Sequence, residues 1–385
     1  MILIKNGKVY TMAGKVYEKG DILIDNGKIV AVGESIESPA DAEIIDAEGR
    51  LVMPGMIEAH CHLGMWGDAV GFEGADGNES VDPVTPQLRA IDSINPMDRT
   101  FEEAREGGIT TVCTGPGSAN VIGGTFATIK TYGKRVDDMI VKEPAAMKIA
   151  FGENPKRVYA DKKKSPTTRM ATAAILREQL FKARAYNEKL QRAKQDPDKK
   201  PEFDIRMEAL VKVINKEIPL KAHAHRADDI FTALRIAKEF DVDITLDHCT
   251  EGHLIAEELA KEGKYVINGP HFTERSKFEL KNKTFETPAA LWKAGVKFSI
   301  TTDHPVVPIQ YLPVCAGLAA RDGLDEMEAL KAITINAAEI LGLDDRLGSI
   351  EKGKDADIVI FDGHPFDLTS RTYAVLIDGK VVYRR

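Results

Sequence analysis

The stretch PGMIEAHCHLG, Pro54–Gly64, places two histidines at alternate positions behind an apolar run that begins LVMPGMI. Alternate residues of a β-strand point to the same face, so the imidazoles of His60 and His62 would project together. Two adjacent imidazoles contribute little to an apolar core, but they make a good half of a metal site. The stretch therefore predicts a buried strand that presents a pair of metal ligands.

Further segments downstream resemble this one, because they are short apolar runs separated by helical patterns such as DDIFTALRIAKEF and LIAEELAKEG. Strands that alternate with helices are the signature of parallel α/β architecture, and eight such strands fit a (β/α)8 TIM barrel. We predict this barrel for residues 54–343. Its later strands are expected within residues 108–115, 125–133, 145–153, 219–227, 243–252, 265–272 and 296–305.

The two ends of the chain carry a different pattern, in which Asn-Gly or Asp-Gly splits apolar runs such as ILIDNGKIVAVG and VLIDGKVVYRR. These dipeptides supply the positive φ angles of tight hairpin turns. The middle of the chain lacks hairpins of this type. We therefore predict that residues 1–53 and 344–385 together build one small β-sandwich beside the barrel.

The composition is that of an ordinary globular protein, with 43% hydrophobic and 29% charged residues in 385. A net charge of -8 argues against nucleic acid as a partner. No apolar run approaches the roughly 20 residues that span a bilayer. The start, MILIKNGKVY, reads as a strand and not as a signal peptide, and the four cysteines form no CxxC pair. We expect a cytoplasmic protein that acts on a small molecule without a membrane partner; a homo-oligomer stays open.

Most histidines fall where the predicted strands end. A TIM barrel holds its active site at the carboxyl ends of its strands, whereas structural histidines would be scattered. This segregation favours a metal site over structural roles. The side chains at these ends are His60, His62, His223, His225, His248, His271, Asp303 and His304.

These residues carry a resemblance to a known family. An HxH on the first strand, histidines on the fifth and sixth, and an aspartate on the eighth resemble the metal-dependent amidohydrolase superfamily. The segment TINAAEILGLDDRLGSIEKGKDADIVIFDG is similar to the closing segment of that superfamily, and PGMIEAHCHLG to its opening one. Within it the chain looks nearest to the branch of imidazolonepropionase and the Xaa-Pro-type dipeptidases. The resemblance implies one metal held by His60, His62 and Asp303 and a second held by His223 and His248.

A two-metal site also needs a bridging anion, and the resemblance offers two candidates. Dipeptidase-like members use a carbamylated lysine, a place that Lys148 in MKIAFGEN would take. Some deaminases use a glutamate at the end of that strand, which corresponds to Glu153. Because a carboxylate needs no modification, Glu153 is the preferred bridge and Lys148 the alternative.

One departure from the family concerns proton handling. Imidazolonepropionase and related deaminases carry HxxE on the fifth strand, but here HAHR places Arg226 three residues after His223. This weakens both assignments, and the arginine could instead pair with a substrate carboxylate. Further candidate substrate contacts are His225, His271 and His304.

Neutral imidazoles with carboxylates suit Zn²⁺, with Fe, Mn or Ni as other options. A divalent ion lowers the pKa of bound water to about 7, and Asp303 could take the water proton and return it to the leaving nitrogen. With one metal, His248 would be free to polarise the carbonyl. We predict a metal-dependent hydrolase of an amide-type C–N bond in a dipeptide or N-acyl amino acid. The alternatives are a deaminase or cyclic-amide hydrolase and, from another class, a catalytically silent scaffold barrel.

Overall fold

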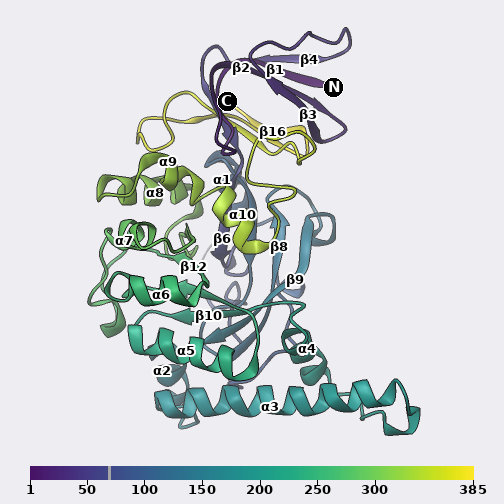
Figure 1. The fold of residues 1–385 in the computed structure, drawn as a ribbon, viewed down its shortest axis with the longest axis vertical. Coiled ribbons are helices and arrows are strands. Elements are labelled where there is room, and N and C mark those ends of the chain that lie inside the picture. Colours follow the sequence, from purple (N-terminus) through teal and green to yellow (C-terminus); the bar gives the residue numbers. More distant parts are fainter. Residues whose placement is uncertain (68–70) are drawn as a thin grey trace.

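The computed structural model describes residues 1–67 and 71–385 and has a mixed α/β architecture built on two eight-stranded sheets (Figure 1). The sheet that contains the middle of the chain is called the central sheet, and the sheet that both chain ends enter is called the terminal sheet. Within the described residues, none of the helices combines the length and the apolar character that crossing a bilayer requires.

The central sheet contains the predicted histidine-bearing strands. Its strand order is β13-β12-β11-β10-β9-β8-β7-β6, so neighbours in the sheet are also neighbours in the chain. Its strands are β6 (Met56–Cys61), β7 (Ile109–Thr114), β8 (Ile122–Lys130), β9 (Ile140–Ala150), β10 (Leu220–Ala224), β11 (Ile244–His248), β12 (Tyr265–Asn268) and β13 (Phe298–Ile300). All residues of β6, β7, β8, β10 and β11 are buried, as expected for strands covered on both faces.

The prediction of eight parallel strands was wrong at one place. Strand β8 runs antiparallel to both of its neighbours, β7 and β9, whereas the other neighbouring pairs are parallel. The reason is the connection, because a short glycine-rich loop replaces the helix that a parallel crossover would need. This loop, residues 115–121, consequently lies at the carboxyl edge of the sheet, beside the histidines.

The two edge strands of the central sheet approach each other. The backbone N–H of His62 donates to the carbonyl of His304 (2.8 Å), and the Thr301 hydroxyl donates to the carbonyl of His60 (2.6 Å). The Glu58 carboxylate accepts from the Thr302 hydroxyl (2.7 Å). These bonds join the segment after β13 to the end of β6, so the first and last carboxyl ends converge on one place.

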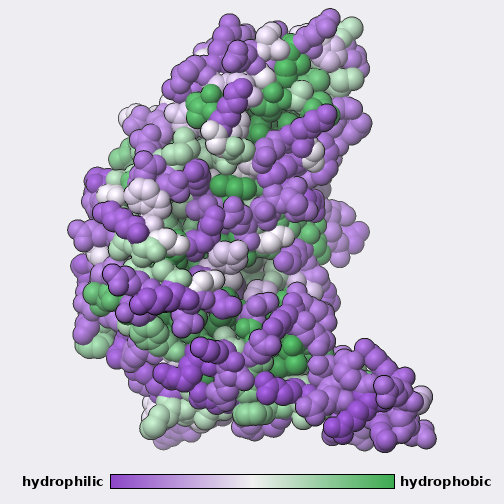
Figure 2. Space-filling view, in the orientation of Figure 1, coloured by the Kyte–Doolittle hydropathy of each residue, from purple (hydrophilic) through white to green (hydrophobic). Residues whose placement is uncertain are grey.

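Helices follow most of the parallel strands, and in Figure 1 helices α5 to α8 cover one side of the central sheet. The long α3 begins at a Thr168 side chain that accepts from the Ala171 N–H, a capping bond that satisfies a free helix donor. Figure 2 shows hydrophilic side chains on its projecting end. The helices are α1 (Thr100–Glu106), α2 (Glu153–Asp161), α3 (Arg169–Ala193), α4 (Ile205–Ile214), α5 (Ala227–Phe240), α6 (Ala256–Glu262), α7 (Thr287–Lys293), α8 (Leu312–Arg321), α9 (Glu326–Lys331) and α10 (Ile335–Leu341).

The terminal sheet joins both chain ends, which lie together at one end of the molecule (Figure 1). β5 from the N-terminal part pairs with β14 from the C-terminal part, and buried apolar residues of both parts form one cluster of their own. The exact domain limits at residues 53 and 343 stay a prediction. The strands are β1 (Ile2–Tyr10), β2 (Val16–Asp25), β3 (Lys28–Gly33), β4 (Glu43–Asp46), β5 (Leu51–Pro54), β14 (Ile358–Phe361), β15 (Thr372–Ile377) and β16 (Lys380–Arg384).

Candidate metal centre and active site

A cavity of about 510 Å³ lies at the carboxyl ends of the central strands, and we call it the site cavity. Its wall contains histidines from β6, β10 and β11 and the aspartate that follows β13. The glycine-rich loop contributes Gly117 and Ser118, and the segment after β12 contributes Thr273 to Lys277 in part. The predicted site residues that line it are His60, His62, Lys148, His223, His225, His248 and Asp303.

The first group of potential ligands is the one that the sequence predicts. His60, His62 and Asp303 each offer a ligand atom, and these atoms lie within 4.8 Å of one another. Oδ1 of Asp303 lies 3.2 Å from Nε2 of His60 and 3.3 Å from Nε2 of His62. Residues separated by about 240 positions in the chain therefore face one point.

The second group contains one residue more than expected. His223 and His248 meet with His225, and the three ligand atoms again lie within 4.8 Å. His225, predicted as a substrate contact, stacks on His248 with ring centroids 4.7 Å apart. Its Nδ1 is 2.8 Å from the Thr250 hydroxyl. The structure thus places His225 beside the predicted ligands of this group.

Backbone carbonyls orient two of the imidazoles. Nδ1 of His62 lies 2.7 Å from the Gly115 carbonyl, and Nδ1 of His248 lies 2.8 Å from the Gly269 carbonyl. Because a carbonyl oxygen only accepts, each Nδ1 carries the proton and donates it. The lone pair of each Nε2 is then left free for a metal ion.

The donor set fits a divalent metal ion. Among the described residues, four buried atoms of these groups have no hydrogen-bond partner: Nδ1 and Nε2 of His60, Nε2 of His223 and Oδ1 of Asp303. A buried polar atom without a partner is costly, and a coordinated metal ion would remove that cost. Burial also lowers the pKa of His60 and His223, so both imidazoles are held in the neutral form that metals bind.

Asp303 is held as a carboxylate. Burial alone would raise its pKa, but the facing imidazoles of His248, His60 and His62 outweigh burial and bring the pKa well below its usual range. An ionised carboxylate beside neutral imidazoles is the combination that a Zn²⁺-like ion prefers.

The backbone departs from ordinary strand geometry at the site. His248 has φ +75°, Cys249 +43° and Asp303 +53°, all in the left-handed region that side-chain-bearing residues seldom adopt. Such conformations persist where the surrounding structure imposes them, and they cluster at functional sites. At His248 the turn has a direct consequence, because it lets two consecutive side chains, Asp247 and His248, both face the interior.

Asp247 is a site residue that the sequence reasoning missed. Its fully buried carboxylate lies 3.2 Å from Nδ1 of His60, 3.3 Å from Nζ of Lys148 and 3.0 Å from Nζ of Lys221. Although burial would raise the pKa of Asp247, these cationic or polarisable neighbours lower it. Strand alternation predicts that a residue next to His248 points away, so only its acidic type in a buried strand could have indicated it.

The two candidate bridging residues have different surroundings. Lys148 lines the site cavity and is fully buried, and burial lowers the pKa of its ammonium group although Asp247 partly offsets this. Glu153 instead begins α2, where its backbone N–H donates to the Glu279 carboxylate (2.8 Å), and it is not among the lining residues. The geometry therefore favours Lys148, the reverse of the order of preference from the sequence.

The other predicted substrate contacts lie outside the wall of the site cavity. Arg226 pairs with Asp228 (2.8 Å), because both lie at the start of α5. His271 contacts the Asn268 side chain (2.7 Å), and His304 accepts from the Ile309 N–H (3.2 Å). A direct role in substrate binding for these three stays a prediction that this geometry does not favour.

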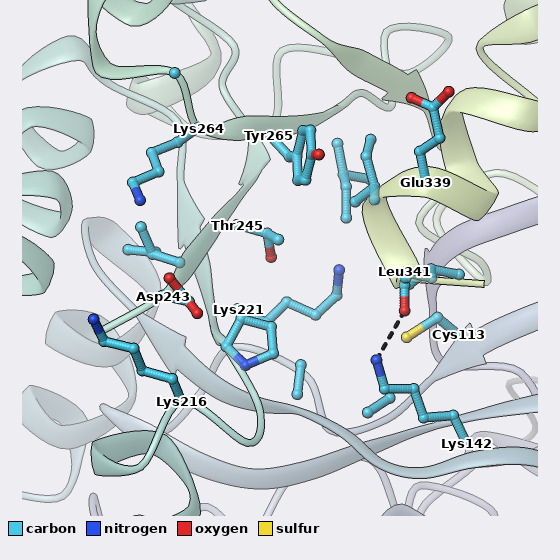
Figure 3. A pocket seen from close by; sticks show the side chains of 18 residues that line it. Cys113, Lys142, Lys216, Lys221, Asp243, Thr245, Lys264, Tyr265, Glu339 and Leu341 are labelled. Atoms are coloured by element: carbon cyan, nitrogen blue, oxygen red, sulfur yellow. Dashed lines mark hydrogen bonds between the residues drawn. The ribbon is translucent and has the colours of Figure 1, made fainter. Parts of the chain in front are cut away.

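A second cavity, of about 330 Å³, opens at the opposite, amino ends of β10 to β12 and against α10; we call it the lower cavity (Figure 3). Figure 3 shows Lys221 and Thr245 on its wall, with Lys142 bonded to the Leu341 carbonyl. It contains no histidine. Lys221 lines the lower cavity, and its ammonium group contacts Asp247, whose carboxylate also contacts His60.

Comparisons with known proteins agree with this geometry. A family model described as "Amidohydrolase family" matches residues 51–382. A crystal structure of an amidohydrolase from Thermotoga maritima MSB8 is 47% identical, covers 100% of both chains and has a TM-score of 0.98. A dihydroorotase from Elusimicrobium minutum is 28% identical over 94% of this chain and 88% of its own.

A further relative is larger than this chain. The amidohydrolase tasK of Hapsidospora irregularis is 30% identical over 94% of this chain, yet the match spans only 39% of that protein. The resemblance inferred from the HxH, the later histidines and the strand-end aspartate is confirmed. The chain belongs to the Amidohydrolase family, whose members are hydrolases that act on carbon–nitrogen bonds.

Proposed function

We propose that this protein hydrolyses an amide-type C–N bond of a small substrate with the help of two divalent metal ions. One observation carries the proposal: two groups of buried ligand atoms, several of them unpartnered, face a single cavity. His60, His62 and Asp303 would hold one ion, and His223 with His248 the second, with His225 adjacent. Zn²⁺ is the preferred ion for this donor set, with Fe, Mn or Ni as alternatives.

The fold supports this placement. We infer that the central sheet closes as a (β/α)8-type barrel in which β8 is reversed, because the segment after β13 is bonded to the end of β6. We also infer that the terminal sheet forms the predicted β-sandwich over its own apolar cluster. Metal ligands at the carboxyl ends of such a barrel occupy its usual active-site face.

Lys148 is the proposed bridge between the ions, as a carbamate. The uncharged amine attacks CO2, its nitrogen gains the carboxyl group and a proton is released, so the cation becomes an anion. Burial favours the uncharged amine that this step needs. Asp247, 3.3 Å from Nζ, and the lining position of Lys148 supply the remaining support.

When bound, a divalent ion supplies a Lewis acid and lowers the pKa of a water molecule to about 7. The carboxylate of Asp303 accepts the proton from the attacking water and returns it to the leaving nitrogen. Oδ1 of this carboxylate lies 3.2 Å from Nε2 of His60 and 3.3 Å from Nε2 of His62, so the three atoms could share one ion. Asp247 fixes the ring of His60 from behind, which keeps its Nε2 directed into the cavity.

A linear amide, such as a dipeptide or an N-acyl amino acid, is the first candidate substrate. A cyclic amide is the second, and the dihydroorotase relative, matched over most of both chains, favours it. A deaminase is less well supported, since Arg226 stands where the HxxE pattern of imidazolonepropionase and related deaminases, described with the sequence resemblance, has a glutamate. A silent scaffold is disfavoured, because every ligand position is occupied by a suitable side chain.

Metal analysis with paired variants tests this proposal. The protein expressed with Zn²⁺ and bicarbonate should bind about two equivalents, and Lys148→Met should reduce this to about one. Glu153→Gln, which removes the competing carboxylate, should leave the metal content unchanged. Only trace metal in the replete protein, or loss of metal from Glu153→Gln alone, contradicts the proposed bridge. A screen of amides, dipeptides and cyclic amides then tests the activity itself.

A further inference from the structure

The wall of the site cavity carries a row of polar side chains that the metal chemistry does not use. Lys277, just before the short turn Phe278–Leu280, donates to the Glu279 carboxylate (3.2 Å) and to the side-chain oxygen of Asn154 (3.1 Å). The Asn154 amide nitrogen in turn donates to the Ser118 hydroxyl (2.8 Å). Lys277, Asn154 and Ser118 all line the site cavity, whereas Glu279 lies buried behind them.

The row leaves two donors unused among the described residues. An ammonium group has three N–H donors, and Lys277 employs two of them on Glu279 and Asn154. The Ser118 hydroxyl accepts from Asn154, so its own O–H stays available. The Lys277 side chain is 18% exposed, and its two hydrogen bonds hold the ammonium group at the cavity wall.

The wall has one ammonium group apart from the proposed metal ligands, and the carboxylates of Asp303 and Glu274 line it as well. Lys148 and Lys277 are the ammonium groups among the described lining residues. If Lys148 becomes a carbamate, as proposed above, Lys277 is left as the cation facing the substrate. Glu274 also lines the wall, but it is exposed to solvent, where water screens its charge.

The row of polar side chains also lies close to the second group of potential ligands, His223, His225 and His248. Glu279, the partner of Lys277, is 3.7 Å from Nε2 of His225 and 3.9 Å from Nε2 of His223. An anion bound by Lys277 would therefore sit beside the second metal group. Such a contact would fix one end of the substrate while the scissile bond faces both groups.

We propose that Lys277 and Ser118 form a subsite for the carboxylate of the substrate, positioned by Asn154 and Glu279. This inference rests on the proposed hydrolase function and narrows its substrates to amides that carry a free carboxylate near the scissile bond. In this proposal Lys277, and not Arg226 as the sequence suggested, pairs with the substrate carboxylate.

Matched acid and amide ligands test the subsite. N-acetyl amino acids and dipeptides are compared with their C-terminal amides, by turnover and by calorimetric binding to the zinc-loaded protein. The free acids should be favoured about 10–150-fold in kcat/KM, the scale of one charge-assisted hydrogen bond. In Lys277→Gln this preference should shrink to within about threefold, and in Ser118→Ala it should fall partly.

The acid-to-amide ratio separates this role from a structural one, because a general disturbance would weaken both ligands alike. Lys281→Gln, an exposed lysine on the same segment outside the cavity wall, is the matched control and should keep the full ratio. Equal binding of acid and amide, or an unchanged ratio in Lys277→Gln, overturns the subsite. Preferential binding of the acids without turnover of any ligand supports the subsite and contradicts the proposed hydrolysis instead.

Discussion

The site cavity and the lower cavity occupy opposite ends of the same strands, and both are lined by charged side chains. In the lower cavity the charges are mostly paired: Lys142 donates to a carbonyl, Lys216 pairs with Asp241 (2.9 Å) and Lys221 with Asp247 (3.0 Å). In the site cavity, by contrast, buried ligand atoms of His60, His223 and Asp303 lack partners within the described chain.

This difference indicates which cavity is the candidate active site. A paired lysine on an open surface contributes to solubility and little else. An unpartnered imidazole in a buried cavity costs stability unless it binds something. Left-handed backbone at His248 and Asp303 adds to that cost at the carboxyl ends. The buried polar atoms without partners, and not the presence of a cavity as such, distinguish the candidate active site.

The largest expected effect is at Asp303 in the site cavity. Asp303→Asn keeps a similar shape and an oxygen that can coordinate, but it cannot accept and return a proton. Turnover should fall by about 10²–10⁴, while most of the metal and the fold remain. Steady-state kinetics on metal-replete protein, with metal content measured in parallel, checks this. A replete variant within about threefold of the original enzyme would make Asp303 a ligand only.

A smaller effect is expected at Asp247, which lies between the two cavities. Asp247→Asn removes the charge that orients His60, so affinity for the first metal ion should fall about 10–100-fold. Competition with a chromogenic chelator measures this without relying on activity. Asp243→Asn, on the exposed wall of the lower cavity, is the matched control and should bind metal as the original does. Equal affinities in the two variants would remove the positioning role.

The smallest effect is expected in the lower cavity itself. Lys264→Met and Tyr265→Phe alter its wall, yet kcat/KM should stay within about twofold and unfolding free energy within about 0.5 kcal/mol. Kinetics and denaturant unfolding of both variants provide the check. A tenfold change in kcat/KM would show that the lower cavity affects the reaction, through Lys221 and Asp247. The two cavities would then not differ in function.

The sequence was sufficient for features that depend on local spacing. The alternation in EAHCH placed His60 and His62 on one face, and the helical periodicity predicted α5 and α6. The apolar runs identified all eight central strands, because buried strands have few other compositions available. The Asn-Gly and Asp-Gly turns identified the hairpins of both ends, which the structure joins in one sheet.

Other features required contacts between distant segments. The direction of β8 depends on the length of a loop, and a run of apolar residues carries no sign of strand direction. Asp247 faces the interior because the backbone turns at His248. The alternation of side chains along a strand therefore fails at this position, and it would have placed Asp247 on the face away from the site. Lys277 could not be predicted as a site residue for a similar reason. In the sequence it is an ordinary loop lysine, and only the fold brings its ammonium group into contact with Asn154 and Glu279.

The amino-acid sequence was therefore enough to predict the family, the strands and the proposed metal ligands, because ligand type and spacing are local and their chemistry is specific. Folded contacts were needed to show which carboxylate lies beside His60, whether Lys148 or Glu153 lines the cavity, and that Lys277 is a lining cation. Those choices depend on distances of a few ångströms between side chains far apart in the chain. Burial and mutual charge set their energies, and neither quantity exists until the chain has folded.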